Sequence, residues 1–226
     1  MTESQLLTET ARFNMIEQQI RTASVLDPVV LKLLAVVRRE DFVPIAFRDL
    51  AFADMEIPLG ADGQAGQTML SPCLEARMLQ ELAIRNTDTV LEVGAGSGFM
   101  AAVLAAKAEF VYTIEIDPRL AELARSNLDA AGVVNVLVRT GDAAHGWEAH
   151  APYDVIVLSG STPVLPESLL RQLKIGGRLV AVVGEGPAMQ LQRVVRKDEA
   201  TFETTAVLET MLAPLVNAAQ SAKFVF

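Results

Sequence analysis

Residues 90–98 read "VLEVGAGSG", and this run predicts the architecture of the chain around it. A strand is predicted to end at Val93, with a helix starting shortly afterwards. Gly94, Gly96 and Gly98 let the backbone turn sharply and come close to a ligand that any Cβ would block. In a doubly wound sheet such a turn lies at the C-terminal edge of the strands, where nucleotides bind. Tight packing alone is the competing explanation of the glycines.

The spacing of these glycines separates two classes of cofactor. Dinucleotide-binding folds use Gly-x-Gly-x-x-Gly, whose third glycine packs the helix against the strand. Here Phe99 occupies that third position, and the pattern is instead Glu92-x-Gly94-x-Gly96-x-Gly98. This pattern resembles motif I of the class I S-adenosylmethionine methyltransferases. The resemblance implies S-adenosyl-L-methionine as the cofactor.

An acidic residue ends each of the next two predicted strands. Glu115 closes "VYTIEID", 21 residues after Gly94, and can accept both ribose hydroxyls, while Asp142 in "TGDAAHGW" is placed to accept from the adenine amine. Such charge-assisted bonds contribute about 1.5–3 kcal/mol each. Taken alone, an acid at a strand end is more often a helix cap, as we interpret Asp117 before Pro118. The predicted cofactor-binding residues are Glu92, Gly94, Ala95, Gly96, Gly98, Glu115, Ile116, Asp142 and Ala143.

Short β-rich runs alternate with helical stretches on both sides of the glycine turn. "VIVL" and "LVAVV" are apolar on both faces, as parallel strands covered by helices are. The alternation predicts an α/β fold, a Rossmann-like, doubly wound, mostly parallel seven-stranded sheet. Residues 190–216 are typical of a C-terminal antiparallel hairpin with "KDEA" as its turn. The predicted strands are 88–94, 109–116, 135–142, 153–160 and 178–184, and the helices between them are 98–108, 117–132 and 165–177.

The N-terminal part predicts helices followed by a long loop. Residues 9–40 are expected to be helical, with Phe13, Ile16 and Ile20 on one buried stripe and Asp27 as the cap of a second helix. The following segment, up to Thr68, is rich in Gly, Pro, Ala and Asp and predicts irregular surface structure. Helix is expected to resume at residues 73–84.

Composition excludes several functional classes. The net charge is −9 with no basic patch, so nucleic acid is not an expected partner. Cys73 is the only cysteine, which fits a reducing cytoplasm, and the polar, acidic start is unlike a signal peptide. The longest apolar stretch is broken by Lys107 and Glu109, so no membrane association is expected. His145 and His150 lie near no cysteine cluster, and no metal site is predicted.

Adding the flanking segments, the chain resembles the protein-L-isoaspartate O-methyltransferases. The most diagnostic features are "FVP" after a helix, the "GQT" loop and "GDxxxGW". The resemblance implies transfer of the methyl group of S-adenosylmethionine to the α-carboxylate of isoaspartyl residues, which begins the repair of damaged proteins. The matching segments are 15–44, 51–60, 66–78, 90–105, 141–157 and 172–184.

From this resemblance we expect one methyltransferase domain spanning residues 1–226. It would comprise an N-terminal helical extension at 1–60, a substrate loop and helix at 61–78, and a cofactor-binding core at 79–226. The partners would be isoaspartyl peptides or proteins, or an unknown small acceptor, with a cytoplasmic location.

The substrate loop departs from the family pattern. The family runs Gly-Gln-Thr-Ile-Ser-Gln-Pro, with its serine beside the reactive methyl, whereas residues 66–72 are Gly-Gln-Thr-Met-Leu-Ser-Pro. Leu70 therefore takes the place of the serine and Ser71 that of the glutamine. The resemblance implies that Thr68, Leu70 and Ser71 line the acceptor site as its catalytic residues. Ser71 or Thr68 could supply the missing contact if the loop shifts by one residue.

The missing serine does not by itself exclude activity. An isoaspartyl carboxylate is ionised at neutral pH, so no general base is needed, and catalysis is mostly orientation. Losing one donor to a carboxylate would slow the reaction by about one to two orders of magnitude. Two alternatives stay open: a related methyltransferase with a different acceptor, and a non-catalytic S-adenosylmethionine-binding module. Nicotinamide-dependent oxidoreduction is disfavoured by Phe99.

Overall fold

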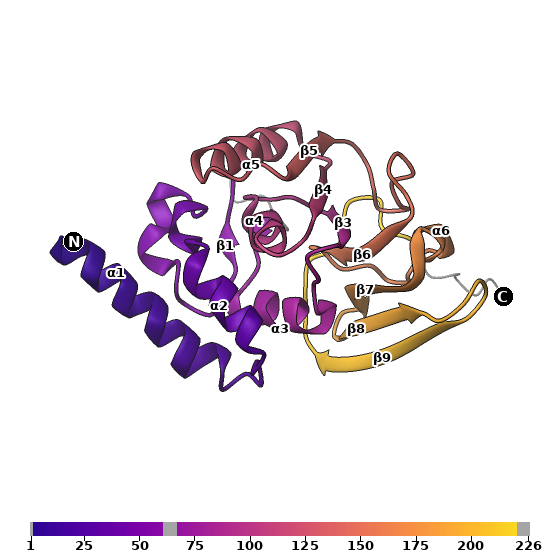
Figure 1. Cartoon of the computed structure of the whole chain (residues 1–226), viewed down its shortest axis with the longest axis horizontal. Coiled ribbons are helices and arrows are strands. Elements are labelled where there is room, and N and C mark those ends of the chain that lie inside the picture. The colour runs from indigo at the N-terminus through magenta and orange to yellow at the C-terminus, as the bar shows by residue number, and fades with distance from the viewer. Residues whose placement is uncertain (1, 61–66, 221–226) are drawn as a thin grey trace.

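The computed structural model describes residues 2–60 and 67–220 and contains one large twisted sheet (Figure 1). Seven strands lie in the order β5-β4-β3-β6-β7-β8-β9, of which the first five are mutually parallel. β8 and β9 add to the edge in antiparallel fashion. The predicted Rossmann-like fold with a C-terminal hairpin is thus confirmed. The strands are β3 (Thr89–Val93), β4 (Phe110–Glu115), β5 (Val136–Thr140), β6 (Tyr153–Leu158), β7 (Leu173–Glu185), β8 (Ala188–Arg196) and β9 (Phe202–Glu209).

Helices cover both faces of the sheet, which explains why its central strands are mostly apolar. On β3, Val90 belongs to one buried cluster and its neighbour Leu91 to another, because successive side chains point to opposite faces. The Val90 face packs against α3 (Pro72–Leu82), α4 (Phe99–Ala105) and α5 (Pro118–Ala130), and the Leu91 face against α6 (Glu167–Arg171).

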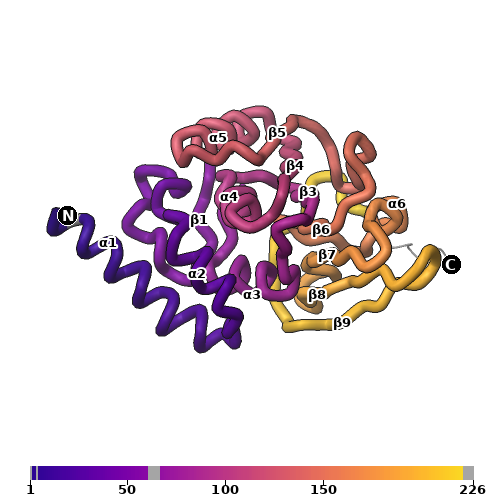
Figure 2. The backbone as a smooth tube through the Cα atoms, viewed as in Figure 1, coloured from indigo at the N-terminus to yellow at the C-terminus, as the bar shows by residue number. Residues whose placement is uncertain are grey.

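The N-terminal extension is helical, as predicted, and lies next to α3 on one side of the molecule (Figures 1 and 2). It comprises α1 (Glu3–Asn14), a π-helical turn (Met15–Ile20) and α2 (Pro28–Val36), which Asp27 caps by accepting from the backbone N–H of Val29 at 2.7 Å. The predicted stripe is partly wrong. Ile16 and Ile20 are buried, but Phe13 is 62% exposed and Met15 is buried instead. The wider π-helical turn changes which residues face the core.

The segment between the extension and α3 is mostly irregular, as predicted. It contains short 3₁₀ turns (Arg39–Asp41 and Ile45–Leu50) and a small antiparallel ladder of β1 (Ile57–Pro58) and β2 (Thr68–Met69). The ladder pairs Ile57 with Met69 and Pro58 with Thr68. Gly66 and the rest of residues 61–66, which belong to the predicted substrate loop, lie outside the described residues.

The predicted helix over residues 165–177 is too long. Only Glu167–Arg171 is helical, and β7 begins at Leu173. The register between β6 and β7 shifts from Tyr153–Leu173 to Val155–Arg178, so the run "KIGG" forms a bulge. Gly176 has a φ of +79°, which L residues rarely adopt, and the glycines therefore mark a kinked strand and not a helix end.

After β9 the chain runs back across the C-terminal ends of the parallel strands (Figure 1, yellow). We call residues 211–218 the strap. Ser161, which follows β6, anchors it: its N–H donates to the Ala213 carbonyl at 2.9 Å, and its carbonyl accepts from the N–H of Leu215 at 2.9 Å. The Ser161 hydroxyl also donates to the Leu212 carbonyl at 2.8 Å. The C-terminal ends of β3, β4, β5 and β6 thus lie on one side of a shared space, and the strap lies on the other.

Candidate active site

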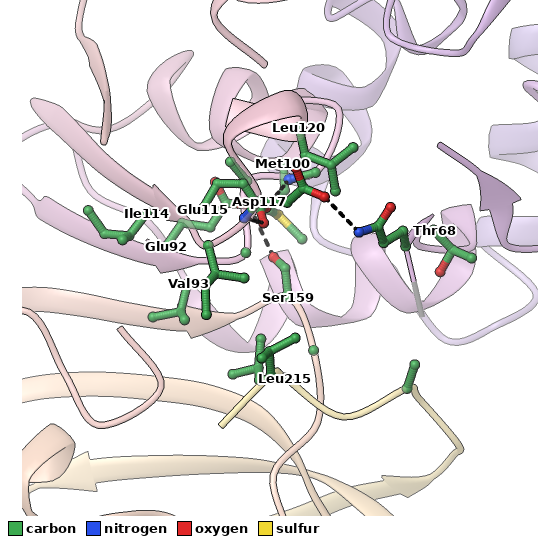
Figure 3. Close-up of a pocket in the computed structure, with 18 of the residues that line it drawn as sticks. Thr68, Glu92, Val93, Met100, Ile114, Glu115, Asp117, Leu120, Ser159 and Leu215 are labelled. Atoms are coloured by element: carbon green, nitrogen blue, oxygen red, sulfur yellow. Dashed lines mark hydrogen bonds between the residues drawn. The ribbon is translucent and has the colours of Figure 1, made fainter. Parts of the chain in front are cut away.

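A cavity of about 970 Å³, including its open mouth, lies at the C-terminal ends of the parallel strands and under the strap. Every predicted site residue lines it except Ser71 and Gly98. Figure 3 shows Glu92, Glu115 and Ser159 close together at the strand ends, with Thr68 farther off on one side and Leu215 of the strap on another. Cofactor and acceptor residues that are far apart in the sequence therefore share one enclosed space.

The three glycines have different environments. Gly94 and Gly96 line the cavity and have φ values of +94° and +52°. A Cβ on Gly98, whose φ is +86°, would stand 3.1 Å from the carbonyl oxygen of Ala124 in α5. Gly98 thus permits close packing of α4 on α5, while Gly94 and Gly96 form a cradle for a ligand.

Glu115 is held beside this cradle by the backbone. Its Oε2 accepts from the N–H of Gly96 at 3.0 Å and its Oε1 from the N–H of Asp117 at 3.1 Å. A carboxylate oxygen has a second lone pair, so both oxygens can still accept from a ribose. Asp117 caps α5 as predicted, and hydrogen bonds from Arg119 lower its pKa to about 2. It also accepts from Gln67 Nε2 at 2.9 Å, which links the acceptor loop to the cofactor side.

Asp142 lies at the far end of the cradle. Its Oδ1 accepts from the N–H of Ala144 at 3.0 Å, and its Oδ2 accepts from the Asn217 side chain at 2.8 Å. Asn217 belongs to the strap, whose Leu215 also lines the cavity and would meet a Cβ on Gly160 at 2.7 Å. The strap could not be predicted from the sequence, because nothing in its composition distinguishes it from an ordinary surface connection.

Glu92 is fully buried at the bottom of the cavity. Ser159 donates to its Oε1 at 3.0 Å, whereas its Oε2 has no hydrogen-bond partner among the described residues. Burial raises the pKa of Glu92 to about 8. A buried carboxyl group with an unsatisfied oxygen is costly unless a ligand compensates it. The cavity thus suits a ligand with a nucleoside, which Glu115 and Asp142 can bind, and a positive charge near Glu92.

The acceptor side is formed by the loop that contains β2. Thr68 donates its hydroxyl to Glu56 Oε2 at 2.7 Å. Leu70 is only 4% exposed, and its carbonyl accepts from Arg39 Nη2 at 2.6 Å. Ser71 precedes α3 but makes no capping hydrogen bond, and it does not line the cavity.

The comparisons with known proteins agree with this geometry. The family model described as "Protein-L-isoaspartate(D-aspartate) O-methyltransferase (PCMT)" matches residues 10–220. The chain belongs to this family.

Relatives and solved structures extend the match over most of the chain. A protein-L-isoaspartate O-methyltransferase of Rhodopseudomonas palustris is 43% identical over 205 residues, 90% of this chain and 92% of that protein. One from Protochlamydia amoebophila is 42% identical over 203 residues, 89% of this chain and 95% of that protein. A solved protein-L-isoaspartate O-methyltransferase has a TM-score of 0.76 at 25% identity; the match covers 91% of this chain but only 66% of that longer chain.

A second solved structure shows the same fold. It is a putative protein-L-isoaspartate O-methyltransferase from Plasmodium falciparum in complex with S-adenosyl-L-homocysteine, with a TM-score of 0.77 at 17% identity, covering 92% of this chain and 97% of that chain. Membership of the family makes this protein an S-adenosylmethionine-dependent methyltransferase.

The structure shows the environment of Leu70, the residue that we predicted to replace the family's serine. Its side chain is buried and apolar, and the neighbouring Ser71 stays outside the cavity. The shift of the loop by one residue, which would bring Ser71 to the acceptor, is not the arrangement that the structure has. Thr68 is the hydroxyl of this loop that reaches the cavity.

Arg39 binds the loop that contains β2 through the carbonyl of Leu70. This role was not predicted from the sequence. Its guanidinium is almost fully buried, forms an ion pair with Glu75, donates to the carbonyls of Ala51 and Leu70, and lies over the ring of Phe99 at 5.1 Å. Phe99 is the first residue of α4 and does not line the cavity. One side chain of the segment between α2 and α3 therefore connects the loop that contains β2 with the helix that follows the glycine turn.

The described residues hold little that would suit a metal or a membrane. In the residues that the structure describes, no cluster of three or more histidine, cysteine or acidic side chains could hold a metal ion. His150 instead stacks on Tyr112 with the ring centroids 4.0 Å apart. No helix in the described ranges is long and apolar enough to cross a membrane.

The raised pKa of Glu92 predicts a pH-dependent affinity for S-adenosylmethionine. In the free protein the carboxyl is largely protonated below its pKa of about 8, and a bound cation favours the ionised form. Binding then releases a proton, so affinity is expected to rise with pH, by up to about tenfold per unit between pH 6 and 8. Isothermal titration calorimetry at pH 6, 7 and 8 measures the affinity for S-adenosylmethionine. Glu92→Gln cannot ionise and should bind more weakly with a flatter profile; an equally steep profile in the variant would refute the assignment.

Proposed function

We propose that the protein transfers the methyl group of S-adenosylmethionine to the α-carboxylate of L-isoaspartyl residues in damaged proteins. The decisive support is that one cavity joins the nucleoside cradle of Gly94, Gly96 and Glu115 to the Thr68 loop, in a chain of the isoaspartyl methyltransferase family. This arrangement brings a methyl donor and a polypeptide acceptor together in a space that the strap closes.

On the cofactor side, each polar group has a separate task. Glu115 accepts from the ribose hydroxyls, Asp142 from the adenine amine, and Glu92 faces the positively charged end. Ala95, Gly96, Ile116 and Ala143 complete the wall of the cavity. When bound, S-adenosylmethionine supplies a methyl group on a positively charged sulfur. All of these groups are acidic or neutral, which suits a cationic ligand.

On the acceptor side, the protein supplies orientation and excludes water. The acceptor carboxylate is itself the nucleophile, so no side chain has to remove a proton. Buried apolar side chains of the cavity, including Met69, Leu70 and Leu212, keep water away from the approaching groups. We infer that Thr68, which lines the cavity, orients the carboxylate, whereas Ser71 lies outside the cavity and takes no part.

One observation favours a second candidate, a related methyltransferase with a different acceptor. Leu70 offers no hydroxyl, and the hydroxyl proton of Thr68 is already donated to Glu56. An acceptor that needs no donor from the loop would fit equally well.

We also infer the domain organisation of the protein, its location and the class of partner that it lacks. We infer a single domain, because one buried cluster extends from Met15 in the extension to Leu212 in the strap. A cytoplasmic location fits the single, half-buried Cys73. The net charge of −9 argues against nucleic acid as a partner.

Labelled S-adenosylmethionine and a matched pair of peptides test the function. The pair has the same sequence, with L-isoaspartate in one peptide and L-aspartate in the other. Methyl transfer to the isoaspartyl peptide alone is the expected result, at a rate about one to two orders of magnitude below that of a relative with the loop serine. Equal transfer to both peptides, or transfer to neither, would contradict the proposal. If the cofactor still bound, the second candidate, a methyltransferase with a different acceptor, would remain.

A further inference from the structure

Glu56 stands next to the proposed acceptor position. It directly precedes β1, and Leu70 directly follows β2, so the two residues are at the same end of the ladder that pairs Ile57 with Met69. The replacement of the family's serine by Leu70 is therefore accompanied by a carboxylate at the adjoining position of the neighbouring strand.

The hydrogen bond between Thr68 and Glu56 has a definite direction. A carboxylate only accepts, so at an O···O distance of 2.7 Å the single hydroxyl proton of Thr68 points to Glu56. Thr68 can then offer only lone pairs to the cavity. A second carboxylate, such as that of an isoaspartyl residue, needs the opposite, a donor.

Other side chains of the cavity offer few free protons. Ser159, farther from Thr68 (Figure 3), donates its hydroxyl to Glu92. Leu70 has no donor on its side chain, and one of the two Nε2 protons of Gln67 goes to Asp117. Near Thr68 and Leu70, an acceptor carboxylate thus meets mainly oxygen lone pairs and apolar surface.

We propose that Glu56 is a specificity-determining residue of the acceptor site, which competes with the acceptor carboxylate for the hydroxyl proton of Thr68. It weakens the binding of carboxylates relative to neutral acceptor groups that donate a hydrogen bond. The proposal rests on the proposed function in one respect: it places the acceptor group at Thr68. The isoaspartyl carboxylate binds productively only when Thr68 turns its hydroxyl away from Glu56.

Two peptides that differ in one group provide the test. One contains L-isoaspartate, and in the other the same α-carboxylate is converted to a primary carboxamide, which is neutral and donates. Both are titrated into protein saturated with S-adenosylhomocysteine, so the readout is binding and not turnover. Glu56→Ala removes the acceptor, so the proton of Thr68 becomes available, and the ratio of carboxylate to carboxamide affinity should rise by about tenfold or more over the parent. Glu56→Gln keeps a neutral amide oxygen, which accepts more weakly than a carboxylate, and should change the ratio in the same direction by a smaller factor.

Two controls separate this effect from a general loss of negative charge. Asp49→Asn removes one charge from an exposed residue of the neighbouring 3₁₀ turn and should leave the ratio unchanged. Adding Thr68→Val to Glu56→Gln should abolish the gain, because the donor is gone. An unchanged ratio in both Glu56 variants, an equal rise in Asp49→Asn, or no binding of either peptide to any variant would overturn the proposal.

The test is independent of the outcome for the proposed function. If the parent transfers no methyl group to the isoaspartyl peptide but the affinity ratio changes as expected, the proposed reaction fails and the role of Glu56 stands. If methyl transfer occurs and the ratio does not respond, the role of Glu56 fails alone.

Discussion

Glu115→Ala is expected to lower the affinity for S-adenosylmethionine by at least about a hundredfold. The substitution removes both acceptors for the ribose, and hydrogen bonds to a charged group contribute about 1.5–3 kcal/mol each. It also leaves the backbone N–H groups of Gly96 and Asp117 without the partner that holds the cradle in place. Isothermal titration with S-adenosylmethionine and with S-adenosylhomocysteine measures the loss, and both ligands should be affected alike because they share the ribose.

Two further variants make this result specific. Glu115→Gln keeps one carbonyl oxygen and should fall between the parent and the alanine variant. Glu109→Ala removes an exposed acid from just before the same strand, β4, on the side away from the cavity, and should bind like the parent. If Glu115→Ala bound the cofactor as tightly as Glu109→Ala does, the cradle would have been assigned to the wrong ligand.

Arg39→Met is expected to lower the free energy of unfolding by about 3–5 kcal/mol. The ion pair of Arg39 and Glu75 is buried, with 1% and 4% of the side chains exposed, and removing the cation leaves an uncompensated carboxylate in the core. The carbonyls of Ala51 and Leu70 lose their donors at the same time. Urea denaturation followed by circular dichroism measures the change.

A double variant tests whether the carboxylate is the cause. Arg39→Met combined with Glu75→Leu removes the stranded charge and should recover most of the lost stability, as replacement of a buried pair by apolar side chains often does. Arg38→Met is the matched control, because the Arg38 side chain is 57% exposed and its ion pairs should contribute less than about 1 kcal/mol. A double variant no more stable than Arg39→Met would show that packing, and not charge, dominates at this position.

The cofactor side of the cavity was predictable because each of its elements is local in sequence. A glycine turn after a strand and acids at the ends of the next two strands can be identified one at a time, and the parallel sheet then brings Gly94, Glu115 and Asp142 to the same edge. The sequence did not distinguish the glycine that lets two helices pack from the glycines that line the cavity. Only the packing of α5 shows that Gly98 serves the contact between helices, while Gly96 lines the cavity.

The parts that sequence reasoning missed depend on contacts between distant residues. Arg39 and Glu75 are 36 positions apart, and Asn217 and Asp142 are 75 positions apart. No periodicity connects such pairs. The helix predicted through residue 177 failed for a related reason: amphipathic spacing continues past Arg171, but pairing with β6 favours a bulged strand there.

The strap sets an order of events for a newly made chain. The sheet, the glycine cradle and the acceptor loop are all synthesised before residue 211, yet the roof over them is made of residues that the ribosome adds afterwards. Because the strap partners of Ser161 and Asp142 follow the whole sheet in the sequence, a chain that has not yet reached residue 211 is expected to leave the cavity more exposed to water. Shielding of the reaction space thus depends on a segment that is added after all the strands on which it rests.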